Sequence, residues 1–218
     1  MKEIISSDYS IWIGENSLSK LDTSNYSKVA ILVDENTKKH CLHLLPSANN
    51  SIIIEVPKGE ENKTISTCKH IWQQLTMNKF DRSSVLINLG GGVIGDMGGF
   101  ASATYKRGID FIQIPTTLLA MADASIGGKL AIDFNGLKNQ VGLFSNPKSV
   151  IINPIFLKTL AEKELKSGFS EIVKSALITN KNLWEKVKNI PFNNLEWKEM
   201  IYASLKIKNK IVISDPKE

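Results

Sequence analysis

A nearly continuous apolar run ends in three consecutive glycines near the middle of the chain. Residues 85–89 lead into Gly90, Gly91 and Gly92, and a helix rich in small residues is predicted from there through Ala103. A run that is apolar at successive positions is typical of a strand buried on both faces of a parallel sheet. A strand, a glycine turn and a helix in this order predict a nucleotide-binding βα unit.

Further apolar runs predict more strands of the same sheet. They cover residues 29–33, 52–54 and 109–114, and a helical stretch is predicted over 64–77. Strands that alternate with helices imply parallel pairing through crossover connections. We therefore expect an α/β fold, a Rossmann-like parallel sheet with crossover helices, preceded by a small hairpin over residues 4–13.

After Pro154 the strand pattern gives way to helical spacing. The predicted helices cover residues 157–165, 169–178, 183–187 and 197–212. We place a domain boundary near residue 160. Residues 1–160 would form the nucleotide-binding α/β domain, and residues 161–218 the beginning of an incomplete α-helical second domain.

Charge and hydropathy limit the classes of partner. The net charge is +5, but the lysines are spread along the chain, and no nucleic-acid motif or interleaving of aromatic residues is present. We expect a solvated basic surface that attracts small anions, and no nucleic-acid partner. Because no run of about 18 apolar residues exists and the first residues lack a secretory pattern, we expect a cytoplasmic protein with no membrane partner.

The cysteines and histidines form no recognisable disulfide or metal pattern. Cys41 and Cys68 sit in no CxxC motif, so we interpret them as reduced core or surface thiols. His40, Cys41 and His43 form one local cluster of metal-ligand types, but their segment offers no fourth ligand. We expect no metal site there.

The glycine turn fits a dinucleotide motif. Gly90, Gly92 and Gly95 satisfy GxGxxG directly after a predicted strand. Glycine permits positive φ and lets the backbone approach a diphosphate, whose charge is stabilised by free amides and the helix dipole. A tight turn packed against a helix is the alternative explanation, but the context favours nucleotide binding. Asp110 lies near the start of the next strand, so we expect the ribose partner to be Asp34, which ends an earlier one.

Several motifs in one order carry a family resemblance. From about Asp34 onward the sequence resembles 3-dehydroquinate synthases. The matching motifs are Gly90–Asp96, Tyr105–Gly108, Pro115–Ala120, Asp123–Lys129, Lys138-Asn139, Phe156–Leu160 and Glu171–Lys174. The resemblance implies an enzyme that converts 3-deoxy-D-arabino-heptulosonate 7-phosphate to 3-dehydroquinate and phosphate, the second step of the shikimate pathway, using catalytic NAD and a zinc or cobalt ion.

The resemblance also implies roles for individual residues. NAD would contact Asp34 and Asn36 on its adenosine side. Its remaining contacts would be Lys58, Gly59, Glu60, Lys63, Gly91, Gly92, Val93, Ile94, Gly95, Asp96, Thr116, Thr117, Asp123, Lys129, Lys138, Phe156, Leu157, Lys158 and Thr159. The catalytic and substrate-binding residues would be Lys129, Lys138, Asn139, Lys174, Arg107 and Asp123. Asp123 would hold the nicotinamide end, and Arg107 would reach the substrate phosphate of a neighbouring subunit, which implies a homodimer.

Glu171 matches a metal ligand of the family, whose metal site also uses two histidines. His40, His43 and His70 all precede the glycine turn. A catalytic zinc site normally needs three protein ligands, so we expect these 218 residues to bind no zinc tightly and to be inactive alone. A truncated sequence, or an enzyme made in separate pieces, would explain this pattern.

Two departures and several rival functions stay open. Leu137 stands where the family commonly has glycine, and residues 133–135 differ from its usual substrate loop, although Gly136 can compensate. A related sugar-phosphate cyclase or an NAD-dependent polyol dehydrogenase could use the same scaffold, but Lys129 and Lys138 favour a substrate whose phosphate must be held. A non-catalytic nucleotide-binding fragment is the alternative from another class.

Overall fold

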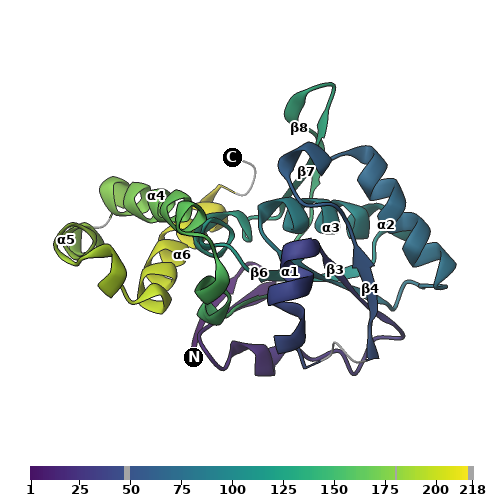
Figure 1. Cartoon of the computed structure of the whole chain (residues 1–218), viewed down its shortest axis with the longest axis horizontal. Coiled ribbons are helices and arrows are strands. Elements are labelled where there is room, and N and C mark those ends of the chain that lie inside the picture. The colour runs from purple at the N-terminus through teal and green to yellow at the C-terminus, as the bar shows by residue number, and fades with distance from the viewer. Residues whose placement is uncertain (47–49, 180, 216–218) are drawn as a thin grey trace.

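The fold is built on a seven-stranded sheet (Figure 1). The computed structural model describes residues 1–46, 50–179 and 181–215. In spatial order the strands are β1 (Lys2–Ser6), β2 (Tyr9–Ile13), β9 (Ser149–Ile152), β6 (Asp110–Pro115), β5 (Val85–Gly90), β3 (Val29–Val33) and β4 (Ile52–Glu55). β1 and β2 pair antiparallel, and the other neighbours pair in parallel. The predicted α/β fold with a Rossmann-like parallel sheet is confirmed, as is the N-terminal hairpin.

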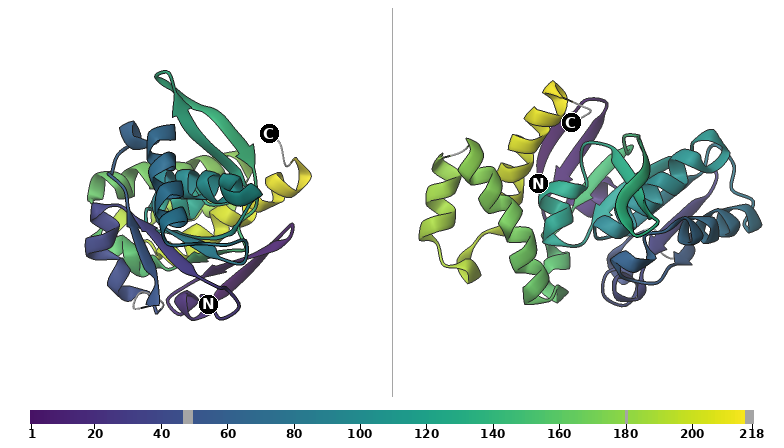
Figure 2. Two further views of the ribbon diagram at one scale, coloured as in Figure 1. Left: turned by 90° about the vertical axis from the view of Figure 1, so that its right-hand side faces the viewer. Right: turned by 90° about the horizontal axis from the view of Figure 1, so that it is seen from above.

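Helices cover both faces of the sheet (Figure 2). α2 (Ile65–Met77) and α3 (Gly92–Thr104) pack on the face that carries Leu32 and Leu86. The opposite face carries Ile31 and Ile87 and meets the C-terminal helices, together with Cys41 at the end of α1 (Glu35–His40). Because successive strand side chains point to opposite faces, β3 and β5 are apolar at nearly every position.

Both cysteine thiols are free and buried. Burial raises the pKa of Cys68 to about 12. Burial is also the main reason why the pKa of Cys41 rises to about 11. The sequence allowed either core or surface thiols, and the structure shows that both are core thiols. Because their pKa values are raised, neither sulfur is activated as a nucleophile.

The chain changes its direction of travel across the sheet at β3. From β3 it passes to β4 on one side, then returns to β5 on the other side and continues to β6. In open α/β sheets, ligands bind outside the carboxyl ends of the strands at such a switch point. Asp34 follows β3 and Gly91 follows β5 at this edge.

A separate β-hairpin projects from the α/β body (Figure 1). It consists of β7 (Lys129–Phe134) and β8 (Leu137–Phe144). Its two-residue turn, Asn135-Gly136, has φ angles of 52° and 77°. Positive φ at both positions belongs to a type I′ turn, for which Asn-Gly is a preferred sequence. The segment is therefore an ordered hairpin and not the loop expected from the sequence, and Leu137 begins its second strand.

The C-terminal part of the chain is helical. It contains the 3-10 helix η7 (Pro154–Thr159) and the α-helices α4 (Glu162–Thr179), α5 (Lys181–Asn189) and α6 (Trp197–Ser214). The predicted helix over 157–165 is wrong, because Leu160 has an extended backbone (φ −77°, ψ 135°) that ends η7. After this break α4 begins at Glu162, and the predicted helix over 169–178 lies within it. The break coincides with the expected boundary, but Ile31 of the sheet and Leu205 of α6 share one core. The division into two domains stays a prediction.

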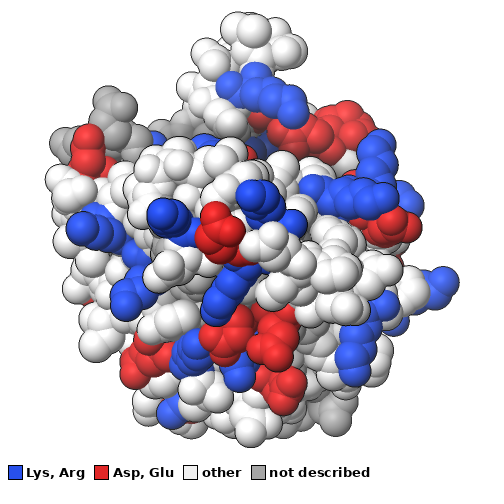
Figure 3. Space-filling view, turned by 90° about the vertical axis from the view of Figure 1, so that its left-hand side faces the viewer, with Lys and Arg blue, Asp and Glu red and all other residues white. Residues whose placement is uncertain are grey.

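The surface over the C-terminal helices carries both signs of charge. On the face that Figure 3 shows, Lys and Arg side chains lie among Asp and Glu side chains. On α4, Lys166 pairs with Glu162 at 2.6 Å, one helical turn away. Mixed charge of this kind differs from the one-sided basic face of a nucleic-acid-binding domain. Across the described ranges, no helix is long and apolar enough to cross a membrane.

Candidate functional site

The corner between β5 and α3 is built from backbone that lacks side chains. A Cβ placed on Gly91 would lie 3.0 Å from Thr117 Cγ2, and one placed on Gly92 would lie 3.8 Å from Ala124 Cβ. The expected need for positive φ is wrong, because the glycines of this motif lie outside the positive-φ region and Gly91 has φ −75°. Space is what requires glycine at Gly91, where a side chain would press on Thr117.

The N-terminus of α3 presents free backbone amides at this corner. Gly91 is the N-cap, and no side chain caps the helix. The first bond to the cap is from Gly95 N to Gly91 O, at 3.0 Å. The amides of Gly92, Val93 and Ile94 have no intrahelical acceptor, because the first turn of any α-helix leaves them unpaired. Together with the helix dipole they form a site suited to an anion such as a diphosphate.

Lys63 links three segments beside the first turns of α3. Its side chain is 5% exposed, and Nζ lies 2.5 Å from Asp96 Oδ2 on α3 and 2.7 Å from Asn139 Oδ1 on β8. The backbone N–H of Asn139 donates to Asp133 Oδ1 at 2.9 Å, which holds Asn139 in a left-handed conformation with φ 55°. Burial raises the pKa of Asp96, and the nearby ammonium of Lys63 opposes this rise.

One cavity of about 800 Å³ brings together five residues that the sequence singled out. Each comes from a different element: α3, the turn η6 (Ala120–Ala124), β7, β8 and α4. In that order the residues are Asp96, Asp123, Lys129, Asn139 and Lys174. The cavity also has an apolar wall, to which Ile207 and Ile211 of α6 contribute. Cations, carboxylates and an amide around one hollow can hold a small, highly oxygenated anion.

Asp123 lies in a single π-helical turn and is paired with α6. The N–H of Ser125 donates to Ala120 O at 3.1 Å, which is the bond that defines this wide turn. Nζ of Lys208 lies 2.8 Å from Asp123 Oδ1 and 2.7 Å from Asp123 O. Sequence reasoning missed Lys208, because nothing in its spacing distinguishes it from Lys206 and Lys210 on the same helix.

Glu171 and Lys174 form an ion pair on α4 beside the cavity. Lys174 Nζ lies 3.0 Å from Glu171 Oε2, and this hydrogen bond raises the pKa of Lys174. In the part of the chain that the structure describes, no three or more His, Cys, Asp or Glu side chains are grouped closely enough to hold a metal ion. Glu171 is therefore a single candidate ligand in these segments.

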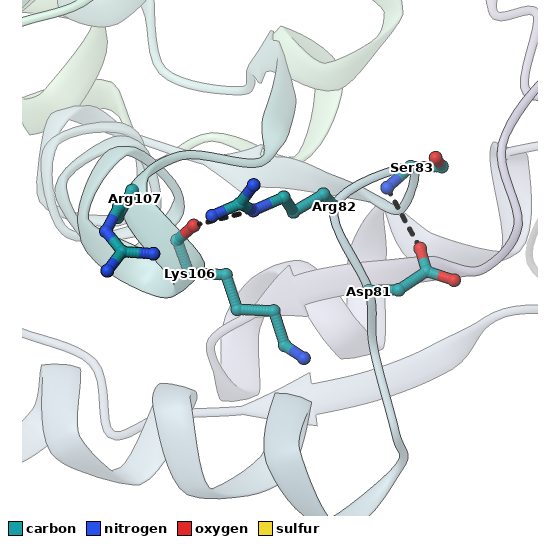
Figure 4. A pocket seen from close by; sticks show the side chains of 5 residues that line it. All are labelled: Asp81, Arg82, Ser83, Lys106 and Arg107. Carbon is teal, nitrogen blue, oxygen red and sulfur yellow. Dashed lines mark hydrogen bonds between the residues drawn. The ribbon is translucent and has the colours of Figure 1, made fainter.

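Arg107 lies apart from the cavity, beyond the C-terminal end of α3. α3 has 13 residues, so about 20 Å of helix separates Arg107 from the glycine corner. A second hollow surrounds Arg107, Lys106 and Arg82 (Figure 4). Lys106 and Arg107 both have positive φ, 52° and 69°, and Arg82 Nε donates to the carbonyl of Lys106 at 3.2 Å. The side chains of Lys106 and Arg107 point in different directions in Figure 4.

The residues expected on the adenosine side lie at the carboxyl ends of β3 and β4. Asp34 caps α1 by accepting from Thr37 N at 2.8 Å, and Asn36 is exposed on the first turn of α1. The N–H of exposed Lys58 donates to Glu35 Oε2 at 2.9 Å. Gly59, with φ 103°, leads into the segment that carries Glu60 and Lys63. One carboxylate oxygen of Asp34 is thus already hydrogen-bonded to the first turn of its own helix.

The other predicted contacts differ in exposure. Lys138 is exposed on the hairpin and pairs with Glu60 at 3.3 Å. Thr116 is buried and its N–H donates to Gly90 O, while Thr117 is half-buried. Phe156 and Leu157 are buried in the core, and Lys158 and Thr159 are exposed. None of these last four residues lines the cavity described above; their expected contact with a cofactor stays a prediction.

Comparison with known proteins gives a family match that covers most of the sheet and the cavity. The family model described as "3-dehydroquinate synthase N-terminal" matches residues 53–167. The chain is 41% identical to the 3-dehydroquinate synthase of Parabacteroides distasonis, over 91% of this chain and 58% of that protein. It is 42% identical to the 3-dehydroquinate synthase of Campylobacter concisus, over 97% of this chain and 61% of that protein. The chain thus spans about three fifths of the length of these relatives.

Solved structures show the same fold at lower identity. A 2-deoxy-scyllo-inosose synthase superposes with a TM-score of 0.85 at 24% identity, over 100% of this chain and 65% of that one. The 2-epi-5-epi-valiolone synthase of Streptomyces hygroscopicus, determined with NAD+ and Zn2+ bound, superposes with a TM-score of 0.80 at 21% identity, over 100% of this chain and 65% of that one. At such identities the likeness establishes the fold alone.

Proposed function

Because the chain belongs to the 3-dehydroquinate synthase family, we propose that it forms the NAD-binding part of an enzyme that converts 3-deoxy-D-arabino-heptulosonate 7-phosphate to 3-dehydroquinate and phosphate. One observation supports this most strongly. The glycine corner at the switch point of the sheet adjoins η6, and η6 contributes Asp123 to the cavity in which the predicted substrate residues converge. A diphosphate site beside an anion-binding cavity is what this reaction requires.

The residues around the corner suit a dinucleotide. The diphosphate would lie against the amides of Gly92, Val93 and Ile94, where a helix N-terminus offers free donors and Gly91 leaves room. The adenosine half would extend toward Asp34 at the end of β3, and the nicotinamide toward Asp123. NAD held there would supply reversible hydride transfer with the carbon that carries a substrate hydroxyl.

The cavity residues suit a phosphorylated, carboxylated sugar. Lys129 and Lys174 line it, and Lys138 lies on the hairpin next to Asn139. An ammonium group on a flexible stem suits a phosphate that must be held and then released. Asn139 offers an amide to a substrate hydroxyl, and its left-handed backbone fixes where that amide lies. These side chains would bind the substrate and orient it for hydride transfer.

Arg107 supports a homodimeric enzyme. It does not line the cavity, and it lies beyond the C-terminal end of α3, about 20 Å along the helix axis from the glycine corner. Because Arg107 does not line the cavity of its own copy, a second copy could supply it across a subunit interface. We propose that the enzyme acts in this way as a homodimer in the cytoplasm.

The described residues do not fit a metal by themselves. Glu171 is already bonded to Lys174, and no group of three ligand-type side chains is found within residues 1–46, 50–179 and 181–215. We derive no catalytic step from a metal on these residues. Glu171 would serve as one ligand of a zinc or cobalt ion only when further ligands are supplied.

Binding and product analysis test the proposal in two steps. Isothermal titration with NAD tests the cofactor half, and we expect saturable binding to one site per chain. For the substrate half, this chain is mixed with the C-terminal remainder of a family relative, NAD, a divalent metal and the seven-carbon keto acid phosphate. Equal release of phosphate and 3-dehydroquinate supports the proposal. Accumulation of NADH without phosphate release would instead indicate a polyol dehydrogenase.

A further inference from the structure

Lys208 joins the last helix of the described chain to Asp123 in the cavity. It lies on α6, and its side chain is 24% exposed. Its ammonium donates a hydrogen bond to the Asp123 carbonyl at 2.7 Å and forms an ion pair with Asp123 Oδ1 at 2.8 Å. Both residues line the same cavity. An ammonium has three N–H donors, and the hydrogen bond to the Asp123 carbonyl uses one of them.

The double contact constrains Asp123 more than a simple ion pair does. The hydrogen bond to the carbonyl ties the π-helical turn to α6, and the ion pair with Oδ1 draws the carboxylate toward the same nitrogen. Such turns are uncommon and frequently occur at functional sites. Within the described segments, Lys208 forms the ion pair with the Asp123 carboxylate, and the charge of Asp123 contributes to the raised pKa of Lys174.

We infer that Lys208 is a positioning residue that holds the Asp123 carboxylate toward the nicotinamide end of the cofactor. The inference rests on the proposed function, in which Asp123 meets that end. It adds a role for α6, because this helix would hold in place a group that belongs to the α/β part of the chain. The opposite expectation is that the pair is an ordinary partly exposed ion pair, which contributes little to stability or to cofactor binding.

The two expectations differ in which part of the dinucleotide is affected. ADP-ribose contains the adenosine and the diphosphate of NAD but lacks nicotinamide. A residue that acts through Asp123 should affect NAD and spare ADP-ribose. A residue that only supports the fold should affect both ligands, or neither.

The experiment compares Lys208→Met and Lys208→Arg with the control Lys210→Met, an exposed lysine on the same helix. Calorimetry measures the Kd of each variant for NAD and for ADP-ribose. We expect Lys208→Met to weaken NAD binding about tenfold, the effect of losing one hydrogen bond to a charged group. ADP-ribose binding should change by less than about twofold, Lys208→Arg should recover most of the NAD affinity, and Lys210→Met should match the wild type.

A second pair of variants keeps the result interpretable if Lys208→Met is poorly folded. In an Asp123→Asn background, replacing Lys208 by Gln should cause little further loss of NAD affinity, because the two residues act as one unit. Equal losses for NAD and ADP-ribose, no loss at all, or additive losses in the double variant would overturn the inference and leave the proposed function intact. A wild-type chain that binds neither ligand would overturn the proposed function and the inference with it.

Discussion

Lys63 Nζ lies 2.5 Å from Asp96 Oδ2, and this buried pair ties the segment after β4 to the first turns of α3. The same ammonium bonds Asn139 on the projecting hairpin. Residues expected to contact the cofactor and the substrate are therefore held in one network before either ligand arrives. Such preorganisation is what a site for hydride transfer needs, because small misplacements cost much of the rate.

Replacing Lys63 by Met should destabilise the fold more than loss of a surface pair does. The change leaves the largely buried Asp96 carboxylate without its cation, and we expect a loss of about 2–3 kcal/mol in the free energy of unfolding, measured with urea. The control is Lys38→Met, which breaks the exposed Lys38–Glu55 pair, also at 2.5 Å. That change should cost less than about 1 kcal/mol. Similar losses for the two variants would contradict the account of this network.

Asp96 should also make stability depend on pH. Its pKa is raised from the ordinary value of 3.8, mainly by burial. The native chain then binds this proton more tightly than the unfolded chain, so the stabilising contribution of protonated Asp96 is fully present below pH 3.8 and is lost as pH rises through the raised pKa. The test is urea unfolding of the wild type and Asp96→Asn from about pH 4 to about pH 7. The free energy of unfolding of the wild type minus that of Asp96→Asn should fall as pH rises. A constant or increasing difference would refute this sign.

Two glycine-to-alanine changes distinguish a glycine that is needed for steric room from a glycine that is needed for its positive φ angle. In Gly91→Ala the new Cβ would press on Thr117 Cγ2 at 3.0 Å, and we expect NAD affinity to fall about tenfold as the corner shifts. In Gly136→Ala the new Cβ meets nothing within 4 Å, but φ is +77°. That change should cost about 1 kcal/mol in stability and leave NAD affinity unchanged. Calorimetry and urea unfolding measure the two effects, and a reversed pattern would show that the corner does not bind the cofactor.

A zinc titration tests the account of the metal. Glu171 is one carboxylate bonded to a lysine, and a catalytic zinc site normally needs three protein ligands. We expect this chain to bind no zinc stoichiometrically at submicromolar concentration in the presence of a competing chromophoric chelator. A tight site of one ion per chain would mean that ligands have been assigned wrongly. The variant Glu171→Gln should not alter the titration.

The sequence predicts the parallel sheet well because its strands are buried on both faces and read as apolar runs. β9 lies outside the predicted runs, since Ser149–Ile152 is short and follows a polar turn. The hairpin β7–β8 was recognisable from Asn135-Gly136, which is a strong signal for a type I′ turn. The helix break at Leu160 has no such local signal, and it follows the segment in which Phe156 and Leu157 are buried in the core shared with the sheet.

The sequence singled out individual residues of the candidate site, but it did not predict their arrangement around one cavity. The motifs singled out Asp123 and Lys174. Sequence spacing does not indicate, however, that η6 and α4, which carry these residues, meet around one cavity. Lys208 carries no motif at all, and only the packing of α6 against η6 brings it to Asp123. Arg107 shows the reverse case, since a motif identified it and the structure places it away from the cavity.

A structure of the chain in complex with NAD tests the central claim most directly. We predict the diphosphate within hydrogen-bonding distance of the amides of Gly92, Val93 and Ile94, the adenosine beside Asp34 and the nicotinamide facing Asp123. A complex saturated with NAD in which the glycine corner holds no diphosphate would contradict the claim.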